Sequence, residues 1–335
     1  MKPIVVAGHA CVDLIPQLPP NLTMSPGTLT HVGPMAMAAG GAVPNVGVAL
    51  HRLGRLVRLA ACVGDDALGR SLAEIVDAAA PGAANGLIVR PGEATSYSVV
   101  VSVPGRDRAF WHCPGVNDTF EPDAVPDATL AGAAWLHFGY PPIMRRVCDD
   151  PAALARLFAR ARGLGLRTSL DLCGIDPNGP AGGVDWRAWL AVVLPHVDVF
   201  TPSFDETAFA LGHAAIAPTR TAATELAAVS RALGAASVLL KLGDRGLFFS
   251  DGRRERHVPC FAVDVVSATG AGDCTIAGFV AGLTHGMEVD DALTLAVAAG
   301  GASCERADAT SGVPAIDVLR QRIRDGWPSL RISLD

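Results

Sequence analysis

Short apolar runs alternate with stretches of helical apolar spacing over most of this chain. The first run, residues 3–8, ends at a glycine and predicts a buried strand. Apolar residues then recur every three or four positions from Ala42 to Leu53 and stop before Gly54, which predicts a helix. Further strands are expected at residues 56–63, 134–138, 166–170, 197–200 and 237–242, and further helices at 67–80, 152–162, 186–194, 204–211, 221–233, 272–285 and 290–305. Such alternation is typical of α/β proteins, in which a mainly parallel sheet carries helices on both faces.

Two segments break this alternation. Residues 14–40 contain many Pro, Thr, Gly and Met residues and show no helical period, so we expect short strands and turns there. Residues 86–113 contain three short β-rich runs, the last two separated by a turn at 104–107. Together the two segments predict a small β-sheet that stands apart from the main layer.

The run Thr269-Gly270-Ala271-Gly272-Asp273 lies between a β-rich segment and an apolar helix pattern. Glycines let the backbone bend tightly there, and the N–H groups that open a helix have no partner inside it, so they attract an anion such as phosphate. Asp273 adds a carboxylate, which is unfavourable for simple phosphate storage but suits a base that takes a proton from an attacking hydroxyl. An aspartate in a first helical turn is also a common cap, so the run alone leaves both interpretations open.

Polar residues and glycines follow several predicted strands at their carboxyl ends. Ligands of open α/β sheets bind beyond that edge. The residues concerned are Asp13, Asp171, Ser203, Glu206, Gly243 and Asp273. Each taken singly is explained by a cap or a turn, but their shared placement on one edge favours a binding site.

The composition of the 335 residues supports one large α/β domain, because 50% are hydrophobic and only 18% are charged. A formal net charge of −6 argues against nucleic-acid binding and leaves room for a small anionic ligand. None of the eight cysteines falls in a C-x-x-C pair, which excludes zinc-ribbon and thioredoxin-like sites and favours reduced, buried thiols. The N-terminal apolar run is too short for a signal peptide or a membrane span, so we expect a cytoplasmic protein without a membrane segment.

The chain resembles the ribokinase-like carbohydrate kinases, the phosphofructokinase B-type family, nearly from end to end. One signature is Gly-Gly-Ala-Val-Pro-Asn at residues 40–45, followed by a helix ending at Gly54, and the other is the run at 269–273. A G-x-x-x-x-G-K-[ST] P-loop is missing, and Thr275 stands where the dinucleotide motif G-x-G-x-x-G requires its third glycine. The resemblance implies a single catalytic domain over the whole chain, with a three-layer α/β/α fold. It also implies a small β-sheet lid, formed by residues 14–40 and 86–113, that would shut water out.

The resemblance further implies roles for individual residues. Asp273 corresponds to the catalytic base of the family, at a helix start opened by Gly270. The backbone N–H groups of Ala271, Gly272 and Asp273 would stabilise charge on the moving phosphoryl group. The matching acceptor-binding positions are Asp13, Gly40, Gly41, Asn45 and Asp171. The matching nucleotide-binding positions are Lys241, Gly243, Gly246 and Thr269. A helix cap explains Asn45 equally well, and an ordinary strand end explains Lys241.

Three departures from the family pattern concern ions and substrate. Ser203 stands in place of the asparagine of an Asn-x-x-Glu motif, while Glu206 is kept. We therefore expect ATP with Mg²⁺ held mainly by phosphates and waters, and Glu206 contacting the ion through water. Ser267 stands in place of an aspartate that helps bind a monovalent cation in some members, which argues against potassium activation. The Asp-x-Asn-x-Arg segment that often follows the middle strand is not reproduced at residues 171–175, so the substrate is poorly determined.

These features predict an ATP-dependent kinase that phosphorylates a primary hydroxyl of a small sugar or sugar acid. A nucleoside (adenosine-like) kinase is the first alternative, since three aromatic residues could line a slot for a base: Phe110, Trp111 and Phe120. These rings could equally pack the inner face of the lid or a contact between two lids.

Other acceptors and roles stay open. A sugar-phosphate acceptor would need cationic partners, for which Arg106, Arg108 and His112 are candidates, although surface turns explain the two arginines. A non-catalytic sugar or nucleotide sensor would keep the fold without the chemistry. Because an exposed lid sheet has unpaired edges, a homodimer through the lid is also expected.

Overall fold

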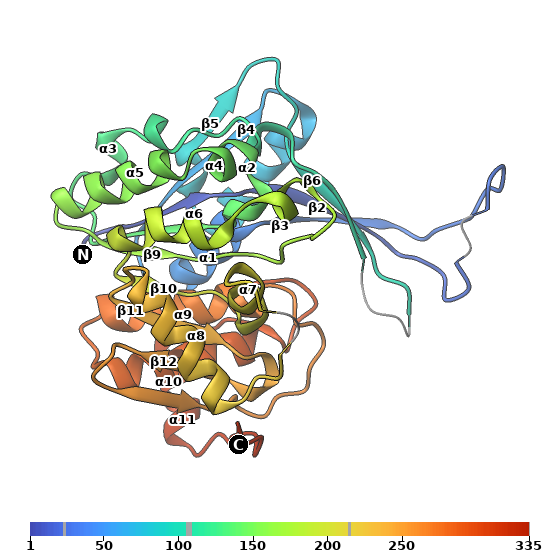
Figure 1. The fold of residues 1–335 in the computed structure, drawn as a ribbon. Helices are drawn as coiled ribbons and strands as arrows, with labels where there is room; N and C mark the ends of the chain where they lie inside the picture. The colour runs from blue at the N-terminus through green and yellow to red at the C-terminus, as the bar shows by residue number, and fades with distance from the viewer. Residues whose placement is uncertain (23–24, 105–108, 214–215, 335) are drawn as a thin grey trace.

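The computed structural model describes residues 1–22, 25–104, 109–213 and 216–334. Its centre is a nine-stranded sheet with the order β13-β12-β11-β10-β9-β8-β1-β4-β5 (Figure 1). The strands are β1 (Ile4–Gly8), β4 (Val57–Gly64), β5 (Leu87–Arg90), β8 (Trp135–Gly139), β9 (Arg167–Leu170), β10 (Val199–Phe200), β11 (Ser237–Lys241), β12 (Leu247–Ser250) and β13 (Glu255–Val258). All neighbours from β5 to β11 are parallel, whereas β12 and β13 are antiparallel. The parallel strands therefore end at one common edge.

Helices cover both faces of this sheet, which confirms the predicted α/β class. One face carries α1 (Ala42–Arg52), α2 (Ala67–Ala79), α9 (Ala271–Thr284), α10 (Val289–Ser303) and α11 (Ile316–Arg324). The other face carries α3 (Asp127–Leu130), α4 (Arg145–Asp149), α5 (Pro151–Gly163), α6 (Trp186–Val193), α7 (Phe204–Ala210) and α8 (Arg220–Ala232). None of the helices formed by these described residues is apolar over a length that could cross a membrane.

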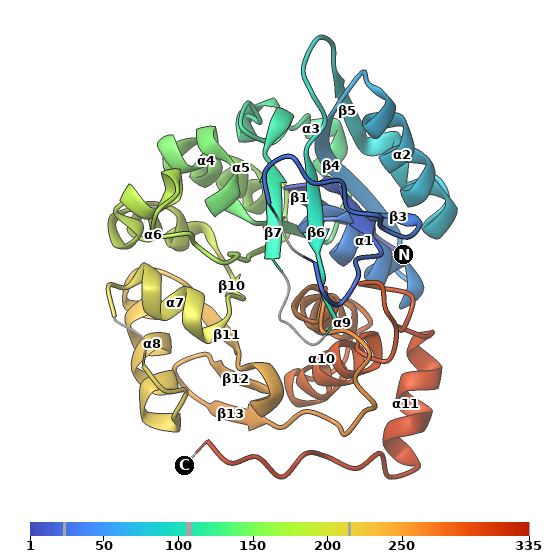
Figure 2. The same ribbon diagram turned by 90° about the vertical axis from the view of Figure 1, so that its right-hand side faces the viewer.

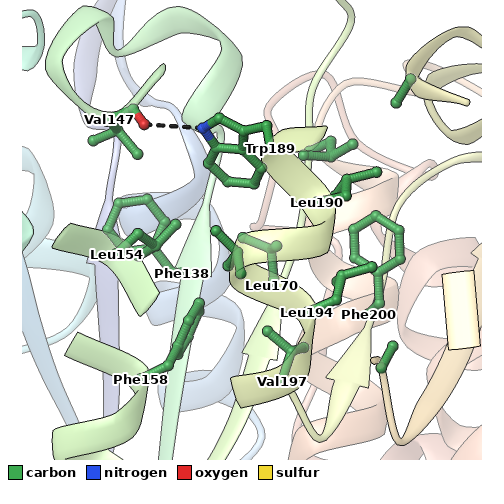
Figure 3. Packing of buried hydrophobic residues seen from close by; sticks show 14 of the residues in the cluster. Phe138, Val147, Leu154, Phe158, Leu170, Trp189, Leu190, Leu194, Val197 and Phe200 are labelled. Atoms are coloured by element: carbon green, nitrogen blue, oxygen red, sulfur yellow. Dashed lines mark hydrogen bonds between the residues drawn. The ribbon is translucent and has the colours of Figure 1, made fainter. Parts of the chain in front are cut away.

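The sheet separates two hydrophobic clusters. Successive residues of a strand point to opposite faces, so Val5 packs in one cluster and its neighbour Val6 in the other. Figure 3 shows part of the cluster under α5 and α6, where Trp189 also donates from its indole nitrogen to the carbonyl of Val147 at 3.1 Å. This two-sided packing explains why the central strands read as continuous apolar runs.

A second sheet of four strands projects from the main layer (Figures 1 and 2). Its order is β3 (Met35–Gly40), β2 (Cys11–Pro16), β6 (Tyr97–Val101) and β7 (Ala109–Cys113). The chain enters this small sheet directly from the carboxyl end of β1. Its register places Ala38, Asp13, Ser98 and His112 side by side across the four strands, so their side chains point to the same face.

The small sheet differs from the expected grouping at one strand. Residues 87–90, which we expected with it, form β5 and pair with β4 at the edge of the large sheet. Local β-propensity marks a strand but does not say which partner it will find. The small sheet also begins at Cys11, earlier than expected.

Candidate active site

The expected anion hole lies at the start of α9. Gly270 caps this helix with a φ of 73°, in the left-handed region, and a Cβ on it would lie 2.5 Å from the Cβ of Ala309. The first-turn N–H groups of Gly272 and Asp273 have no acceptor inside the helix, because helical bonding starts one turn later. The N–H of Ala271 donates across a turn at 3.3 Å. The helix start therefore offers the N–H groups of Gly272 and Asp273 to an anion.

The carboxylate of Asp273 is buried, with 1% of the residue exposed, and two distant side chains hold it. Asn45 Nδ2, near the start of α1, donates to Oδ2 at 2.9 Å. The hydroxyl of Tyr140 donates to Oδ1 at 3.0 Å and to Oδ2 at 2.9 Å. Burial raises the pKa of Asp273 to about 6, against the opposing pull of Lys241, Asn45 and Tyr140. Such a carboxylate is ionised at pH 7 and is still basic enough to accept a proton, which suits a general base.

Sequence reasoning did not single out Tyr140. It follows β8 directly, and its φ of 68° makes it the one non-glycine residue with a positive φ in the described part of the chain. Such a backbone conformation costs on the order of 1–3 kcal/mol and is concentrated at functional sites. Burial and the neighbouring carboxylates, Asp273 first, raise the pKa of Tyr140 well above its ordinary value. The hydroxyl therefore stays protonated and remains a donor to Asp273.

Lys241 and Asp171 form a buried ion pair at the ends of β11 and β9. The Lys241 Nζ lies 2.7 Å and 2.8 Å from the two carboxylate oxygens of Asp171, which is fully buried. Burial disfavours the charge of Lys241, but the carboxylates of Asp171 and Glu206 outweigh it and raise its pKa. A Cβ on Gly272 would lie 3.5 Å from Lys241 Nζ, so the ammonium stands next to the anion hole. Asp171 was expected among the acceptor-binding residues, but both of its carboxylate oxygens accept from Lys241 and position that side chain.

A cavity of about 620 Å³ opens on this group of residues. The expected residues that line it are Ser203, Glu206, Lys241, Gly243, Gly246, Gly270, Ala271, Gly272 and Asp273. Apolar residues also line it, among them Phe261, Val263 and Val297. Thr269, expected among the nucleotide-binding residues, is not among the lining residues but stands between Ala268 and Gly270, which are. Its hydroxyl accepts a hydrogen bond from Ser267 at 3.1 Å. A lining that combines polar groups with apolar side chains matches a ligand with phosphates and a flat base.

Ser203 and Glu206 form a capping box at the start of α7. The Ser203 N–H donates to Glu206 Oε2 at 2.7 Å, and the Ser203 hydroxyl accepts from the Glu206 N–H at 3.3 Å. The described residues contain no group of three or more His, Cys, Asp or Glu side chains that could hold a metal ion. Any magnesium here would therefore take most of its ligands from phosphates and water.

The expected acceptor residues Asp13, Gly40, Gly41 and Asn45 lie where β2, β3 and α1 meet. A Cβ on Gly40 would lie 2.5 Å from the carboxylate of Asp13, so a side chain there would displace that carboxylate. Gly41 begins α1 with a φ of 89°, and a Cβ on it would overlap the ring of His9. Burial raises the pKa of Asp13 to about 6. Asn45 is the member of this group in direct contact with Asp273.

The aromatic slot expected for a nucleoside does not form as a unit. Phe120 is 1% exposed and packs on Phe138 in the core under α5. Trp111 pairs with Val99 and so points to the face of the small sheet opposite His112. Phe110 shares the face of His112 but is 52% exposed. Arg106 and Arg108, the expected partners of a sugar phosphate, lie outside the described residues.

A three-layer α/β/α fold with a buried carboxylate at a glycine-opened helix start defines the class of the protein as a phosphotransferase. The family described as pfkB family carbohydrate kinase matches residues 1–316. The chain belongs to this family and is a sugar kinase, which confirms the resemblance drawn from its two signatures.

Individual relatives agree with this assignment. The chain is 29% identical to a 2-dehydro-3-deoxygluconokinase of Thermoproteus tenax over 284 residues, 82% of each protein. It is 31% identical to a ribokinase of Lactococcus lactis over 88 residues, which is 26% of this chain and 29% of that protein. Among solved structures, the ribokinase of Arabidopsis thaliana complexed with ribose and ATP has a TM-score of 0.77 at 21% identity, covering 96% of this chain and 98% of that one. The last comparison confirms the ribokinase-like fold.

Proposed function

We propose that this sugar kinase transfers the terminal phosphoryl group of ATP to a primary hydroxyl of a small sugar or sugar acid. One observation carries the proposal: the buried Asp273 lies at the open start of α9, held by Tyr140 and Asn45. Phosphoryl transfer requires alignment, neutralisation of charge and a base near the nucleophile, and this arrangement supplies the base and the anion hole together.

Each residue has a distinct role in the proposed reaction. Asp273 takes the proton of the acceptor hydroxyl as its oxygen attacks phosphorus. The N–H groups of Gly272 and Asp273 stabilise the charge on the transferring group, and the adjacent ammonium of Lys241 adds a fixed positive charge. Gly243 and Gly246 leave room for the nucleotide in the turn after β11, as the cavity lining supports.

The residues fit ATP with magnesium. When bound, Mg²⁺ would neutralise phosphate charge and orient the reacting groups. Glu206 would contact it through water, since its carboxylate lines the cavity while one oxygen keeps the capping box. Some members of the family have, at the position of Ser267, an aspartate that helps bind a monovalent cation. The serine found here supports turnover without potassium.

We assign the whole chain to one catalytic domain, with the small sheet of β3, β2, β6 and β7 as its lid. The outer strands β3 and β7 each have one unpaired edge, and exposed Met35 and Trp111 lie on them. These features support a homodimer through the small sheet. A monomer in analytical ultracentrifugation at assay concentration contradicts the homodimer and leaves the kinase proposal standing.

The test of the proposed function is the Asp273→Asn variant, compared with Asp264→Asn at an exposed position outside the site. ADP release is measured with ATP and magnesium across a panel of sugars, sugar acids and nucleosides. Asp273→Asn should lose nearly all turnover and keep ATP affinity, whereas Asp264→Asn should match the wild type. Normal turnover by Asp273→Asn would refute the base assignment. ATP binding without consumption on the whole panel would favour the sensor alternative.

A further inference from the structure

Two histidines lie beside the acceptor residues and have ring nitrogens without partners. His9 follows β1 and is 1% exposed, and neither of its ring nitrogens meets a hydrogen-bond partner among the described residues. Its ring centroid lies 5.2 Å from that of His112 and 6.1 Å from that of Tyr140. The ring also lies against Gly41, where a Cβ would overlap its Nδ1. His9 therefore stands between the small sheet and the tyrosine that holds Asp273.

His112 approaches the same place from β7. Its Nδ1 lies 3.0 Å from the hydroxyl of Ser98, while its Nε2 is buried without a partner among the described residues. Strand register places His112 and Ser98 in one row with Asp13, on one face of the small sheet. The two rings together present three buried, unpartnered nitrogens, both of His9 and Nε2 of His112. Buried polar groups are nearly always hydrogen-bonded in native proteins, to protein, water or ligand, so these nitrogens are available to a bound molecule.

The charge around the pair restricts that ligand. The four strands of the small sheet contain no lysine or arginine. Asp13 lies in the same row of the small sheet as His112, and Asp273 is bonded to Tyr140, whose ring is near that of His9. The ammonium of Lys241 is engaged by Asp171. Burial lowers the pKa of both His9 and His112, so neither ring supplies a positive charge at neutral pH. Among the described residues, which do not include Arg106 and Arg108, an anionic acceptor would therefore meet like charges and no unpaired cation.

Neutral imidazole offers one donor and one acceptor, which is the complement of a hydroxyl group. We propose that His9 and His112 are the acceptor-recognising pair of this kinase and that the site takes an uncharged polyhydroxyl compound, a free sugar or the ribose of a nucleoside. This inference rests on the proposed function and narrows its acceptor, because it excludes sugar acids and sugar phosphates as preferred substrates.

The first test compares kcat/KM of the wild-type protein on ribose, fructose, adenosine, 2-keto-3-deoxygluconate and fructose 6-phosphate by ADP release. The kcat/KM for a neutral compound should exceed that for either anion by about tenfold or more. Comparison of ribose and fructose with adenosine then shows whether the acceptor is a free sugar or a nucleoside. Higher kcat/KM on either anion would overturn the inference while leaving the kinase function intact. No turnover on any compound would instead count against the proposed function.

The second test measures acceptor affinity by calorimetry with a non-hydrolysable ATP analogue, in His9→Asn, His112→Asn and the control His213→Asn, an exposed histidine far along the chain. Each of the first two changes should weaken acceptor binding about tenfold with nucleotide affinity unchanged, and His213→Asn should have no effect. Unchanged acceptor affinity in both His9→Asn and His112→Asn would overturn the inference. Thermal melting identifies a variant that fails to fold. If His9→Asn does not fold, the His112→Asn variant still tests the pair, because His112 lies on the half-exposed small sheet.

Discussion

The hydrogen bond from Tyr140 to Asp273 leads to a quantitative prediction. Replacing Tyr140 by Phe removes the hydroxyl that donates to both carboxylate oxygens, at 3.0 and 2.9 Å, and keeps the ring. The backbone conformation, with its φ of 68°, is equally unfavourable for both residues, so the change isolates the hydroxyl.

The size of the effect follows from the lost bond. A hydrogen bond to a charged group contributes about 1.5–3 kcal/mol, and one pKa unit corresponds to about 1.4 kcal/mol. The hydroxyl stabilises the ionised form of Asp273, so its removal should raise the pKa of that carboxyl from about 6 to roughly 7–8. A base must be ionised to act, and therefore kcat/KM at pH 7 should fall about two- to tenfold and recover near pH 9.

The assay is the pH profile of kcat/KM between about pH 5 and pH 9. The chain has two tyrosines, and the second, Tyr97 in β6, provides the matched control. Tyr97→Phe should keep the acid limb near the pKa of about 6 that Asp273 has in the native protein. An unchanged acid limb in Tyr140→Phe would refute the argument that its hydroxyl governs the ionisation of Asp273.

Three further predictions concern the surroundings of the base. Lys241→Met should lower the free energy of unfolding by about 3–5 kcal/mol in chemical denaturation, because it leaves the fully buried carboxyl group of Asp171 without its partner. The double variant with Asp171→Leu should regain most of that stability but no turnover. Gly270→Ala should destabilise the protein by roughly 1–2 kcal/mol and weaken nucleotide binding, because Gly270 has a φ of 73°. The control Gly163→Ala, at a helical position with open space around it, should leave the stability nearly unchanged in the same experiment. Asp13→Asn should raise the acceptor KM about tenfold yet retain the acid limb of kcat/KM, and loss of that limb would mean that Asp13 rather than Asp273 sets it.

The fold could be predicted well because its main signals are local. Apolar runs and helical spacing identified the strands of the parallel sheet, and the glycine-rich helix start identified α9. The partner of β5 could not be predicted, because pairing with β4 depends on the chain path between them. Phe120 was similarly misleading, since its contact with Phe138 in the core is set by tertiary packing.

The candidate site was only partly predictable for the same reason. Asp273 and Asn45 stand out as motif residues, but the sequence does not reveal that their side chains touch across 228 positions. Tyr140 and His9 were missed, although each directly follows a strand at the carboxyl edge of the sheet. The strand-end rule that selected Asp13 and Asp171 would have found both, had it been extended from carboxylates to aromatic and imidazole side chains.

The two serines that depart from the family pattern both hold backbone groups at a helix start. Ser203 caps α7 through its hydroxyl, as an asparagine side chain also can. The Ser267 hydroxyl accepts from the N–H of Thr269 at 3.2 Å and thereby fixes the turn that leads to Gly270. Ser267 lacks the negative charge of an aspartate, and Ser203 offers a hydroxyl where an asparagine offers an amide. The hydrogen bonds of the two serines therefore hold the turns before α7 and α9 without an ion. Beside the anion hole, the protein itself contributes the positive charge of the Lys241 ammonium.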